Sequence, residues 1–276
     1  MMKDINTNQQ LNLKGTGLTS TLRCSLKCKL CCTFSPYYNP APHFNYDIIK
    51  KTVDKYFKIV NNVDKFTISG GEPFMHEELH LIIEYISNYF DSIGTLEIIT
   101  NGTIMPNDKL INTIVKFKNK INIMIDQYGD LSKKVRDIKE CFDKKEISYR
   151  IRNYGKDNPH CGGWVDFGDF NRKHFTEEET IEKFNKCAYP KKLQFCFSIM
   201  KGEIHPCTPS RRCMELGIIK KDKSEYIDLF DEQASVEEQR EKFISILNKN
   251  YLSACAYCNG LCEDSQRFIP AEQLTD

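Results

Sequence analysis

Cys24-Ser-Leu-Lys-Cys28-Lys-Leu-Cys31 places three thiols on one short loop, in a C-x3-C-x2-C spacing. A structural zinc site takes four ligands, and a cubane iron–sulfur cluster is usually held by four cysteine thiolates. Three thiols therefore predict a metal centre with one open position, which is typical of a reactive site. Two other interpretations stay open at this point: three buried cysteines, or a zinc site with His43 as a distant fourth ligand.

Segments with strand-like and helix-like patterns alternate on both sides of this loop. Strands are predicted over residues 15–22, 65–69, 95–100, 121–126 and 147–152, and helices over 45–57, 77–90, 108–118 and 131–145. This alternation implies parallel strands joined by helical crossovers. The predicted fold class is therefore α/β.

Three of the predicted strands end in segments that suit a binding site. Gly70-Gly71-Glu72-Pro73 follows the strand at 65–69, Thr100-Asn101-Gly102 closes the next strand, and Asp126 closes the one after it. Parallel α/β folds gather their ligand sites at these carboxyl ends. Two glycines let the backbone pass close to a ligand, and the carboxylate of Glu72 suits an amino group. An ordinary Asn-Gly turn is the alternative for the second segment.

The cysteine loop and the Gly-Gly-Glu segment together resemble the signature of the radical S-adenosylmethionine (radical SAM) enzymes. The resemblance implies a six-unit partial (β/α) barrel and a [4Fe-4S] cluster on Cys24, Cys28 and Cys31, with Cys32 outside the ligand set. The amino and carboxylate groups of SAM would fill the open position. The family often has an aromatic residue before the third cysteine, where this chain has Leu30, so adenine packing there would be aliphatic.

The same resemblance implies which rim residues contact SAM. The segment Gly70, Gly71 and Glu72 corresponds to the part that holds the SAM amino group. Thr100 and Asn101 correspond to residues that line the pocket. Asp126 is placed to bond a ribose hydroxyl.

A second group of cysteines occupies the last third of the chain. The sequence has 13 cysteines, an odd number without an apparent export signal, which favours metal ligation over disulfides. Cys187, Cys207 and the pair Cys255-Ala-Tyr-Cys258 are enough to enclose a four-iron cluster. A structural zinc site on the same four residues is the alternative.

This arrangement resembles the auxiliary-cluster regions called twitch and SPASM in radical SAM enzymes. The full SPASM type ends in C-x2-C-x5-C-x3-C, whereas this chain ends in C-x2-C-x3-C, which favours the single-cluster twitch type. Three cysteines are then spare, Cys196, Cys213 and Cys262, with the replacement of one of the four ligands by Cys262 as an open alternative. We expect a barrel over 1–154, a linker and active-site loop over 155–186, and a small α+β auxiliary domain over 187–276. In the auxiliary domain, the sequence predicts a hairpin of strands 194–200 and 203–205, a strand over 226–229 and a helix over 236–247.

Composition sets limits on the function. Of the 276 residues, 40% are hydrophobic and 28% are charged, which is ordinary for a globular protein. The formal net charge of +1 suggests neither a nucleic-acid nor a membrane partner. No apolar run reaches the length of a membrane span, and residues 1–10 lack the apolar core of a signal peptide. The expected location is the cytoplasm.

The resemblance implies reductive cleavage of SAM to a 5′-deoxyadenosyl radical that abstracts hydrogen, with an electron donor such as flavodoxin or ferredoxin. An auxiliary cluster favours net oxidation, since it can accept the electron that a substrate radical must lose. The single-cluster spacing looks like that of small dehydrogenases of the 2-deoxy-scyllo-inosamine type, which oxidise an aminocyclitol alcohol. Arg152 and Arg172 are then candidate catalytic residues, with Trp164 as a wall for a sugar ring.

Two other functions remain open from the sequence. One is a radical SAM maturase of a ribosomal peptide, although only 23 residues precede Cys24, fewer than a leader-binding module needs. The other is an electron carrier with two iron–sulfur clusters, which would not explain the Gly-Gly-Glu segment at the end of a strand.

Overall fold

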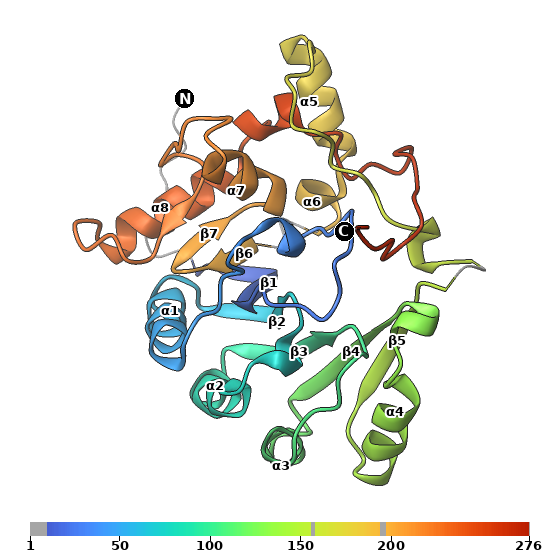
Figure 1. Ribbon diagram of the computed structural model, residues 1–276. Coiled ribbons are helices and arrows are strands. Elements are labelled where there is room, and N and C mark those ends of the chain that lie inside the picture. The colour runs from blue at the N-terminus through green and yellow to red at the C-terminus, as the bar shows by residue number, and fades with distance from the viewer. Residues whose placement is uncertain (1–9, 156–157, 194–196, 276) are drawn as a thin grey trace.

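One curved sheet forms the centre of the molecule (Figure 1). The computed structural model describes residues 10–155, 158–193 and 197–275. Within these residues the sheet has eight strands in the order β5-β4-β3-β2-β1-β6-β7-β8. The strands are β1 (Asn12–Thr21), β2 (Asn62–Gly70), β3 (Ile93–Thr100), β4 (Ile121–Gln127), β5 (Tyr149–Asn153), β6 (Phe197–Met200), β7 (Glu203–His205) and β8 (Ile227–Asp228).

Strands β1 to β5 are all parallel, and helices connect them. The helices α1 (Tyr46–Ile59), α2 (Leu79–Ile86), α3 (Asp108–Lys116) and α4 (Val135–Lys144) lie together on one side of the sheet (Figure 1). Two of them begin at side-chain caps, because Asn45 accepts the N–H of Ile48 and Asn107 accepts the N–H of Leu110. The predicted α/β class is confirmed.

The sixth parallel strand does not come from the part of the chain that the six-unit prediction implied. The segment before residue 155 supplies five parallel strands, and residues 147–152 correspond to the fifth, β5. The sixth, β6, comes from the carboxyl-terminal third and pairs with β1, at the opposite end of the parallel strands from β5. Strands β7 and β8 then extend the sheet in antiparallel fashion. The sequence shows where strands occur but not which neighbour each one pairs with.

The predicted elements of the last third are present, and three further helices accompany them. The predicted hairpin corresponds to β6 and β7, with residues 194–196 outside the described residues, and the predicted helix 236–247 is α8 (Val236–Leu247). The further helices are α5 (Glu177–Lys186), α6 (Ala188–Lys191) and α7 (Thr208–Glu215). They lie on the side of the sheet opposite α1 to α4 (Figure 1).

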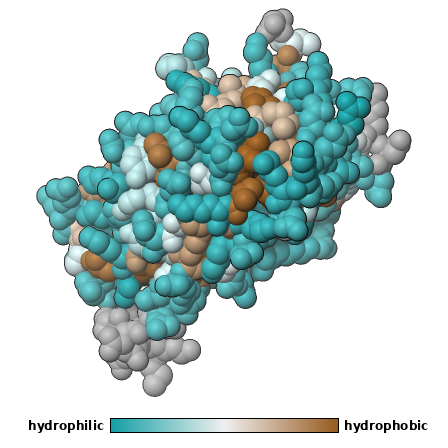
Figure 2. All heavy atoms as spheres, turned by 90° about the horizontal axis from the view of Figure 1, so that it is seen from below, coloured by the Kyte–Doolittle hydropathy of each residue, from teal (hydrophilic) through white to brown (hydrophobic). Residues whose placement is uncertain are grey.

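Apolar side chains fill the space between the sheet and helices α1 to α4. Tyr56, Phe66, Ile98, Ile123 and Phe142 belong to one large core cluster and are completely buried. The face of the molecule seen from below is mostly hydrophilic, with groups of hydrophobic residues among the hydrophilic ones (Figure 2). Of the helices in the described residues, none combines the length and the apolar character that a bilayer span requires.

Candidate active site

The three cysteines of the predicted cluster loop follow directly after β1, at the carboxyl edge of the parallel strands. Cys28 is buried, Cys24 and Cys31 are partly buried, and Cys32 is exposed. Burial, with a smaller contribution from negative charge on the neighbouring cysteines, raises the pKa of Cys24 to about 12 and that of Cys28 to about 11. The three thiols are therefore within electrostatic reach of one another, in a setting where a cation would favour the thiolates.

Hydrogen-bond donors point at the sulfurs of Cys24 and Cys28, while the hydroxyl beside Cys31 Sγ, that of Thr33, donates to Gly70 O at 3.1 Å. Cys24 Sγ accepts from the backbone N–H of Leu26 at 3.5 Å and from Asn101 Nδ2 at 3.6 Å. Cys28 Sγ accepts from Gln273 Nε2 at 3.3 Å, and Cys31 Sγ lies 3.2 Å from the hydroxyl of Thr33. Donors at thiol sulfurs suit thiolates that ligate a cluster. The residues of this loop thus fit the group that the sequence predicts.

The two glycines of the Gly-Gly-Glu segment pack against the chain's own backbone. A Cβ on Gly70 would lie 2.0 Å from the carbonyl oxygen of Thr21, and one on Gly71 would lie 2.2 Å from that of Arg23. The backbone N–H groups of Gly71 and Glu72 donate to the same two carbonyls, at 2.7 Å and 2.9 Å. This structure explains the glycines by contact with the entrance to the cluster loop, whereas the sequence suggested contact with a ligand.

Glu72 is completely buried where β2 and β3 end. Its Oε1 accepts from the N–H of Phe74 and the hydroxyl of Thr100, both at 2.9 Å, and its Oε2 accepts from the N–H of Asn101 at 2.7 Å. Burial raises the pKa of this carboxyl to about 7, although the three donors work in the opposite direction. A carboxylate has about four acceptor positions, so one position on Oε2 remains for a ligand.

Thr100 and Asn101 connect the end of β3 to the cluster loop. Thr100 is the donor to Glu72 described above, and Asn101 Nδ2 donates to Ser25 Oγ at 3.1 Å as well as to Cys24. Gly102 has a positive φ of 68°, as the turn alternative predicted. Asn101 therefore both forms a turn and orients a predicted cluster ligand.

Asp126 and Arg152 form an ion pair across β4 and β5, where they are register partners. Arg152 Nε and Nη2 donate to the two carboxylate oxygens of Asp126 at 2.5 Å and 2.7 Å. Burial acts to lower the pKa of Arg152, but Asp126 outweighs it and the pKa is raised. This guanidinium can hold a hydroxyl or an anion but does not suit the role of a base. The ribose role predicted for Asp126 would compete with this ion pair.

Aromatic rings surround the ion pair. The rings of Tyr128 and Tyr154 stack at 5.2 Å, and Trp164 meets Tyr128 edge-on at 5.5 Å. The guanidinium of Arg152 lies 5.9 Å from the centre of the Tyr154 ring. Trp164 thus belongs to the aromatic group around the ion pair, and its role as a wall for a ring-shaped substrate stays a prediction. Arg172, by contrast, is exposed, and the adjacent Lys173 N–H donates to Ala256 O beside the second cysteine group.

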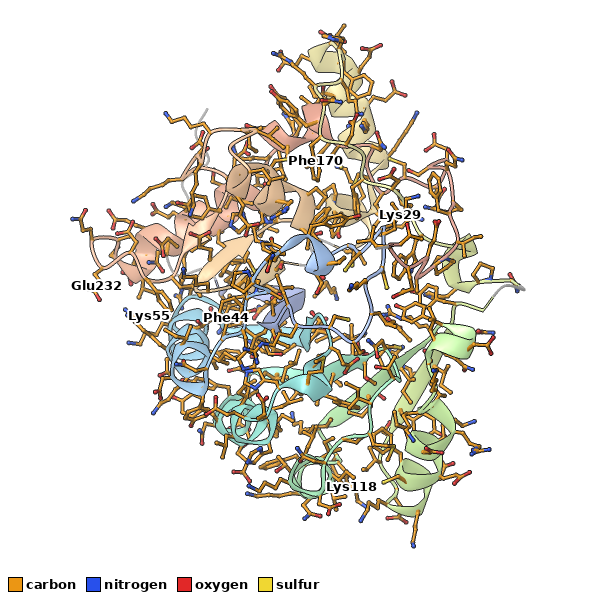
Figure 3. All side chains as sticks on the ribbon, in the orientation of Figure 1. Lys29, Phe44, Lys55, Lys118, Phe170 and Glu232 are labelled. Carbon is orange, nitrogen blue, oxygen red and sulfur yellow. The ribbon has the colours of Figure 1, made fainter. Side chains whose placement is uncertain are left out.

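A cleft with a volume of about 390 Å³ runs beside the cluster loop. Cys31 and Leu30 line it together with Phe34, Phe167 and Phe170. Lys29 and Phe170, which Figure 3 labels, both line it, one from the cluster loop and one from the segment before α5. Leu30, predicted to contact adenine, is therefore at the surface of a ligand-sized space.

The second cysteine group lines a separate cavity between α5, α6 and α7. Its wall includes all four predicted ligands: Cys187, Cys207, Cys255 and Cys258. Burial raises the pKa of Cys207 well above its usual value, and the charges of the other three raise it further. Cys207 precedes the first turn of α7, and Gly260 N donates to Cys258 Sγ at 3.2 Å. These residues also fit a cluster.

The remaining cysteines of this region are placed differently. Cys262 is buried and does not line the cavity. Its Sγ lies 3.8 Å from the carbonyl oxygen of Lys183. Cys213 is buried in a small apolar cluster with Met214 and Ile219. Cys196 lies outside the described residues. Cys213 and Cys262 thus lie outside the cavity wall, but negative charge on Cys262 contributes to the raised pKa of Cys258, so Cys262 is close to the four predicted ligands.

Aromatic packing connects the two cysteine groups, which the sequence did not indicate. Phe34, three residues after Cys31, packs with its ring 6.3 Å from that of Phe167. Phe34, Phe167 and Cys258 form one buried cluster. Phe167 lines both the cleft beside Cys31 and the cavity of the second group. The two candidate metal centres are thus neighbours separated by apolar side chains.

His43 does not act as a fourth ligand in this arrangement. Its side chain groups with His76 and Glu77, whose ligand atoms lie within 4.8 Å of one another. Both ring nitrogens of His76 already have partners, Phe44 O and the N–H of Glu78. His43 Nδ1 lies 3.1 Å from Thr21 Oγ1. We interpret this group as structural.

The family follows from comparison with known proteins. The model of the radical SAM superfamily matches residues 18–183, which is more than half of the chain and includes the cluster loop and the Gly-Gly-Glu segment. The chain belongs to the radical SAM superfamily. Membership implies an enzyme that uses SAM and a [4Fe-4S] cluster, and the fold described above agrees with it.

Curated relatives share only part of their length with this chain. The antilisterial bacteriocin subtilosin biosynthesis protein AlbA of Bacillus subtilis (strain 168) is 33% identical, over 38% of this chain and 22% of its own. GTP 3′,8-cyclase of Aquifex aeolicus (strain VF5) is 32% identical, over 34% of this chain and 29% of its own. The matched segment spans less than a third of each relative.

Solved structures share the fold over nearly the whole chain. BtrN in complex with AdoMet and 2-DOIA has a TM-score of 0.58 at 13% identity, covering 95% of this chain and all of that one. A hexahistidine-tagged form of anSMEcpe with bound AdoMet has a TM-score of 0.52 at 13% identity, covering 95% of this chain and 92% of that one. At this level of identity the likeness concerns the fold.

Proposed function

We propose that this chain is a radical SAM oxidoreductase of dehydrogenase type that acts on a small molecule such as a sugar or an aminocyclitol. Cys24, Cys28 and Cys31 hold the cluster that binds SAM, and the second cysteine group holds an auxiliary [4Fe-4S] cluster of twitch type. When bound, the first cluster and SAM supply a 5′-deoxyadenosyl radical that removes a hydrogen atom, and the auxiliary cluster supplies an acceptor for one electron.

The observation that carries this proposal is the cavity with four cysteines next to the cluster loop. A tetrahedral zinc ion with Zn–S bonds of ~2.3 Å brings its sulfurs to about 3.8 Å from one another. Within the residues that the structure describes, no three cysteine sulfurs lie within 4.8 Å of one another. This wider spacing supports a cubane cluster over the zinc alternative.

The side chains of the site have distinct roles in this proposal. Glu72 accepts a hydrogen bond from the amino group of SAM at its remaining position on Oε2. Arg152, fixed by Asp126, donates to substrate hydroxyls, and Trp164 contacts the ring. Phe34 and Phe167 exclude water from the region between the two centres. Arg172 is exposed, and its predicted catalytic role is left to the experiment.

Two kinds of substrate remain to be separated. The likeness in fold to BtrN, solved with AdoMet and 2-DOIA, supports a small molecule. The similarity to AlbA, a bacteriocin biosynthesis protein, favours the alternative, a maturase of a peptide or protein. Both share the same radical chemistry, so only the substrate distinguishes them.

The test begins with protein reconstituted with iron and sulfide without oxygen. Given dithionite and SAM, the wild type is expected to form 5′-deoxyadenosine, and the triple variant with Cys24, Cys28 and Cys31 changed to Ala is expected to form none while keeping its auxiliary iron. A panel of sugars, aminocyclitols and peptides then identifies the substrate by consumption coupled to 5′-deoxyadenosine. Formation of 5′-deoxyadenosine by the triple variant would contradict the ligand assignment.

A further inference from the structure

The carboxyl-terminal tail lies against the cluster loop, although more than 240 residues separate them in sequence. Cys28 and Gln273 form an antiparallel bridge. The backbone N–H of Lys29 donates to Glu272 O at 2.7 Å, and that of Leu274 donates to Lys27 O at 2.8 Å. Figure 1 shows the chain end beside the loop that follows β1. The tail is thus held in register with the loop by backbone bonds on both sides of Gln273.

The side chain of Gln273 points at a predicted cluster ligand. Its Nε2 lies 3.3 Å from Cys28 Sγ and 2.7 Å from Ala271 O, while its Oε1 accepts the N–H of Lys27 at 2.8 Å. Both neighbours of Nε2 are acceptors, and the neighbour of Oε1 is a donor. These partners fix which end of the amide faces the sulfur.

We infer that Gln273 is a positioning residue that raises the reduction potential of the SAM-binding cluster through its N–H···Sγ bond to Cys28. This inference rests on the proposed function, because it takes Cys28 as a cluster ligand. An added electron increases the negative charge on the ligand sulfurs. A donor therefore stabilises the reduced cluster more than the oxidised one, and hydrogen bonds to sulfur are among the factors that set such potentials.

The tail is joined to the active-site segment as well. The backbone groups of Trp164 and Phe268 exchange two hydrogen bonds, at 3.0 Å and 2.8 Å. A Cβ on Gly163 would lie 2.6 Å from Phe268 O, so this contact is close. The same tail segment therefore touches the wall of the proposed substrate site and the ligand of the cluster. These contacts hold the tail, and with it the donor to Cys28, against both segments.

Two variants of Gln273 separate its hydrogen bond from its contribution to folding. Gln273→Leu removes the donor. Gln273→Glu keeps the length of the side chain and the acceptor for Lys27 but puts an anionic oxygen at the sulfur. Glu272→Gln is the matched control. Glu272 precedes Gln273 in the chain and is exposed, and its Oε1 lies 3.8 Å from Lys29 Nζ.

The readout is the midpoint potential of the cluster, followed by electron paramagnetic resonance during anaerobic reductive titration. The signal that changes on addition of SAM identifies the cluster with the open position. We expect the midpoint to become more negative in Gln273→Leu and more negative again in Gln273→Glu. The control should keep the wild-type midpoint, and all four proteins should keep their iron content and thermal unfolding temperature.

Each contrary result has a distinct meaning. Equal midpoints in all four proteins, each with a SAM-sensitive signal, would overturn the role of Gln273 and leave the proposed function standing. A wild type that shows no SAM-sensitive signal would overturn the proposed function and this inference with it. Loss of iron in both Gln273 variants would show that the residue is needed for cluster assembly, which also overturns a role in tuning.

Discussion

The carboxylate of Glu72 accepts three hydrogen bonds from groups at the ends of β2 and β3 while keeping one position for a ligand. Its residue type and its place after a strand could be predicted from the sequence. The burial of Glu72 could not be predicted, because its donors Thr100 and Asn101 lie at the end of β3. The sequence does not show that β3 pairs with β2. The same holds for Gln273, which no local pattern connects to Cys28.

Replacing Glu72 by Gln should weaken SAM binding. The charge-assisted bond to the amino group is lost. The neutral amide must also use its oxygen to accept the N–H of Asn101 or else place its NH2 group against that donor. A bond of this kind contributes roughly 1.5–3 kcal/mol, which corresponds to about a 10- to 150-fold loss of affinity. Equilibrium binding of SAM to reconstituted protein measures it. Glu77→Gln, at an exposed neighbouring carboxylate, is the control and should bind as the wild type does.

The raised pKa of Glu72 predicts that SAM affinity depends on pH. Without SAM the carboxyl has a pKa of about 7, so below pH 7 it is mostly protonated and must lose its proton to accept a hydrogen bond there. Affinity should therefore rise as the pH rises through 7, with binding at pH 6 weaker by about tenfold than at pH 8. The negative charges of Asp126 and Cys24 also act on Glu72, so both residues are left unchanged in the proteins compared. A profile that is flat in the wild type would contradict this role; in Glu72→Gln it should be flat.

At the scale of elements, the strands and helices of the barrel were predictable because apolar residues recur with clear periods. The helix α5 was not, since Glu177, Glu178 and Glu179 precede only a few apolar positions, although Thr176 and Glu179 form a capping box. The short helix α7 begins at Thr208 with Cys207 as its N-cap residue, whereas the sequence indicated Cys207 only as a ligand. Strand neighbours were not predictable either, because β6 pairs with β1 over a long separation.

The contact between the Gly-Gly-Glu segment and the entrance to the cluster loop predicts a cost for a single methyl group. Gly71→Ala would place a Cβ 2.2 Å from Arg23 O, so the two segments must move apart. We expect a loss of stability of about 1–3 kcal/mol, measured by urea unfolding of the apoprotein, together with weaker cluster retention. Gly15→Ala in β1 is the control, because its Cβ would lie 3.8 Å from the nearest atom, Lys65 O. Equal losses of stability in Gly71→Ala and Gly15→Ala would show that the close contact at Gly71 carries no special cost.

At the scale of the whole molecule, the barrel and the carboxyl-terminal third share one sheet through the pairing of β1 with β6. This pairing and the packing of Phe34 on Phe167 place the two cysteine groups side by side. The sequence shows both cysteine groups but does not show how far apart they lie. That distance depends on the order of the strands and on the loop between β5 and α5. The predicted division at residues 154 and 187 remains a prediction. Strand β6 lies beyond the second boundary and yet belongs to the barrel sheet.

This shared architecture predicts separate effects for the two cysteine groups. The proposed function assigns one four-iron cluster to each group, so we expect about eight irons per chain. Cys255→Ala removes a ligand from the cavity wall and should lower the count toward four. The variant should still form 5′-deoxyadenosine, since the cluster loop is intact, but should give much less oxidised product, since the second electron lacks its acceptor. Cys213→Ala, in a separate apolar cluster, is the control and should keep both the iron and the product.

Measured metal content decides between the alternatives. Zinc in place of iron in the second cavity would make that site structural and remove the argument for net oxidation. About twelve irons would restore the two-cluster SPASM type, with cysteines recruited beyond the four of the cavity wall. About eight irons, combined with loss of product but not of 5′-deoxyadenosine in Cys255→Ala, would support electron transfer from the substrate to the auxiliary cluster across the Phe34–Phe167 contact.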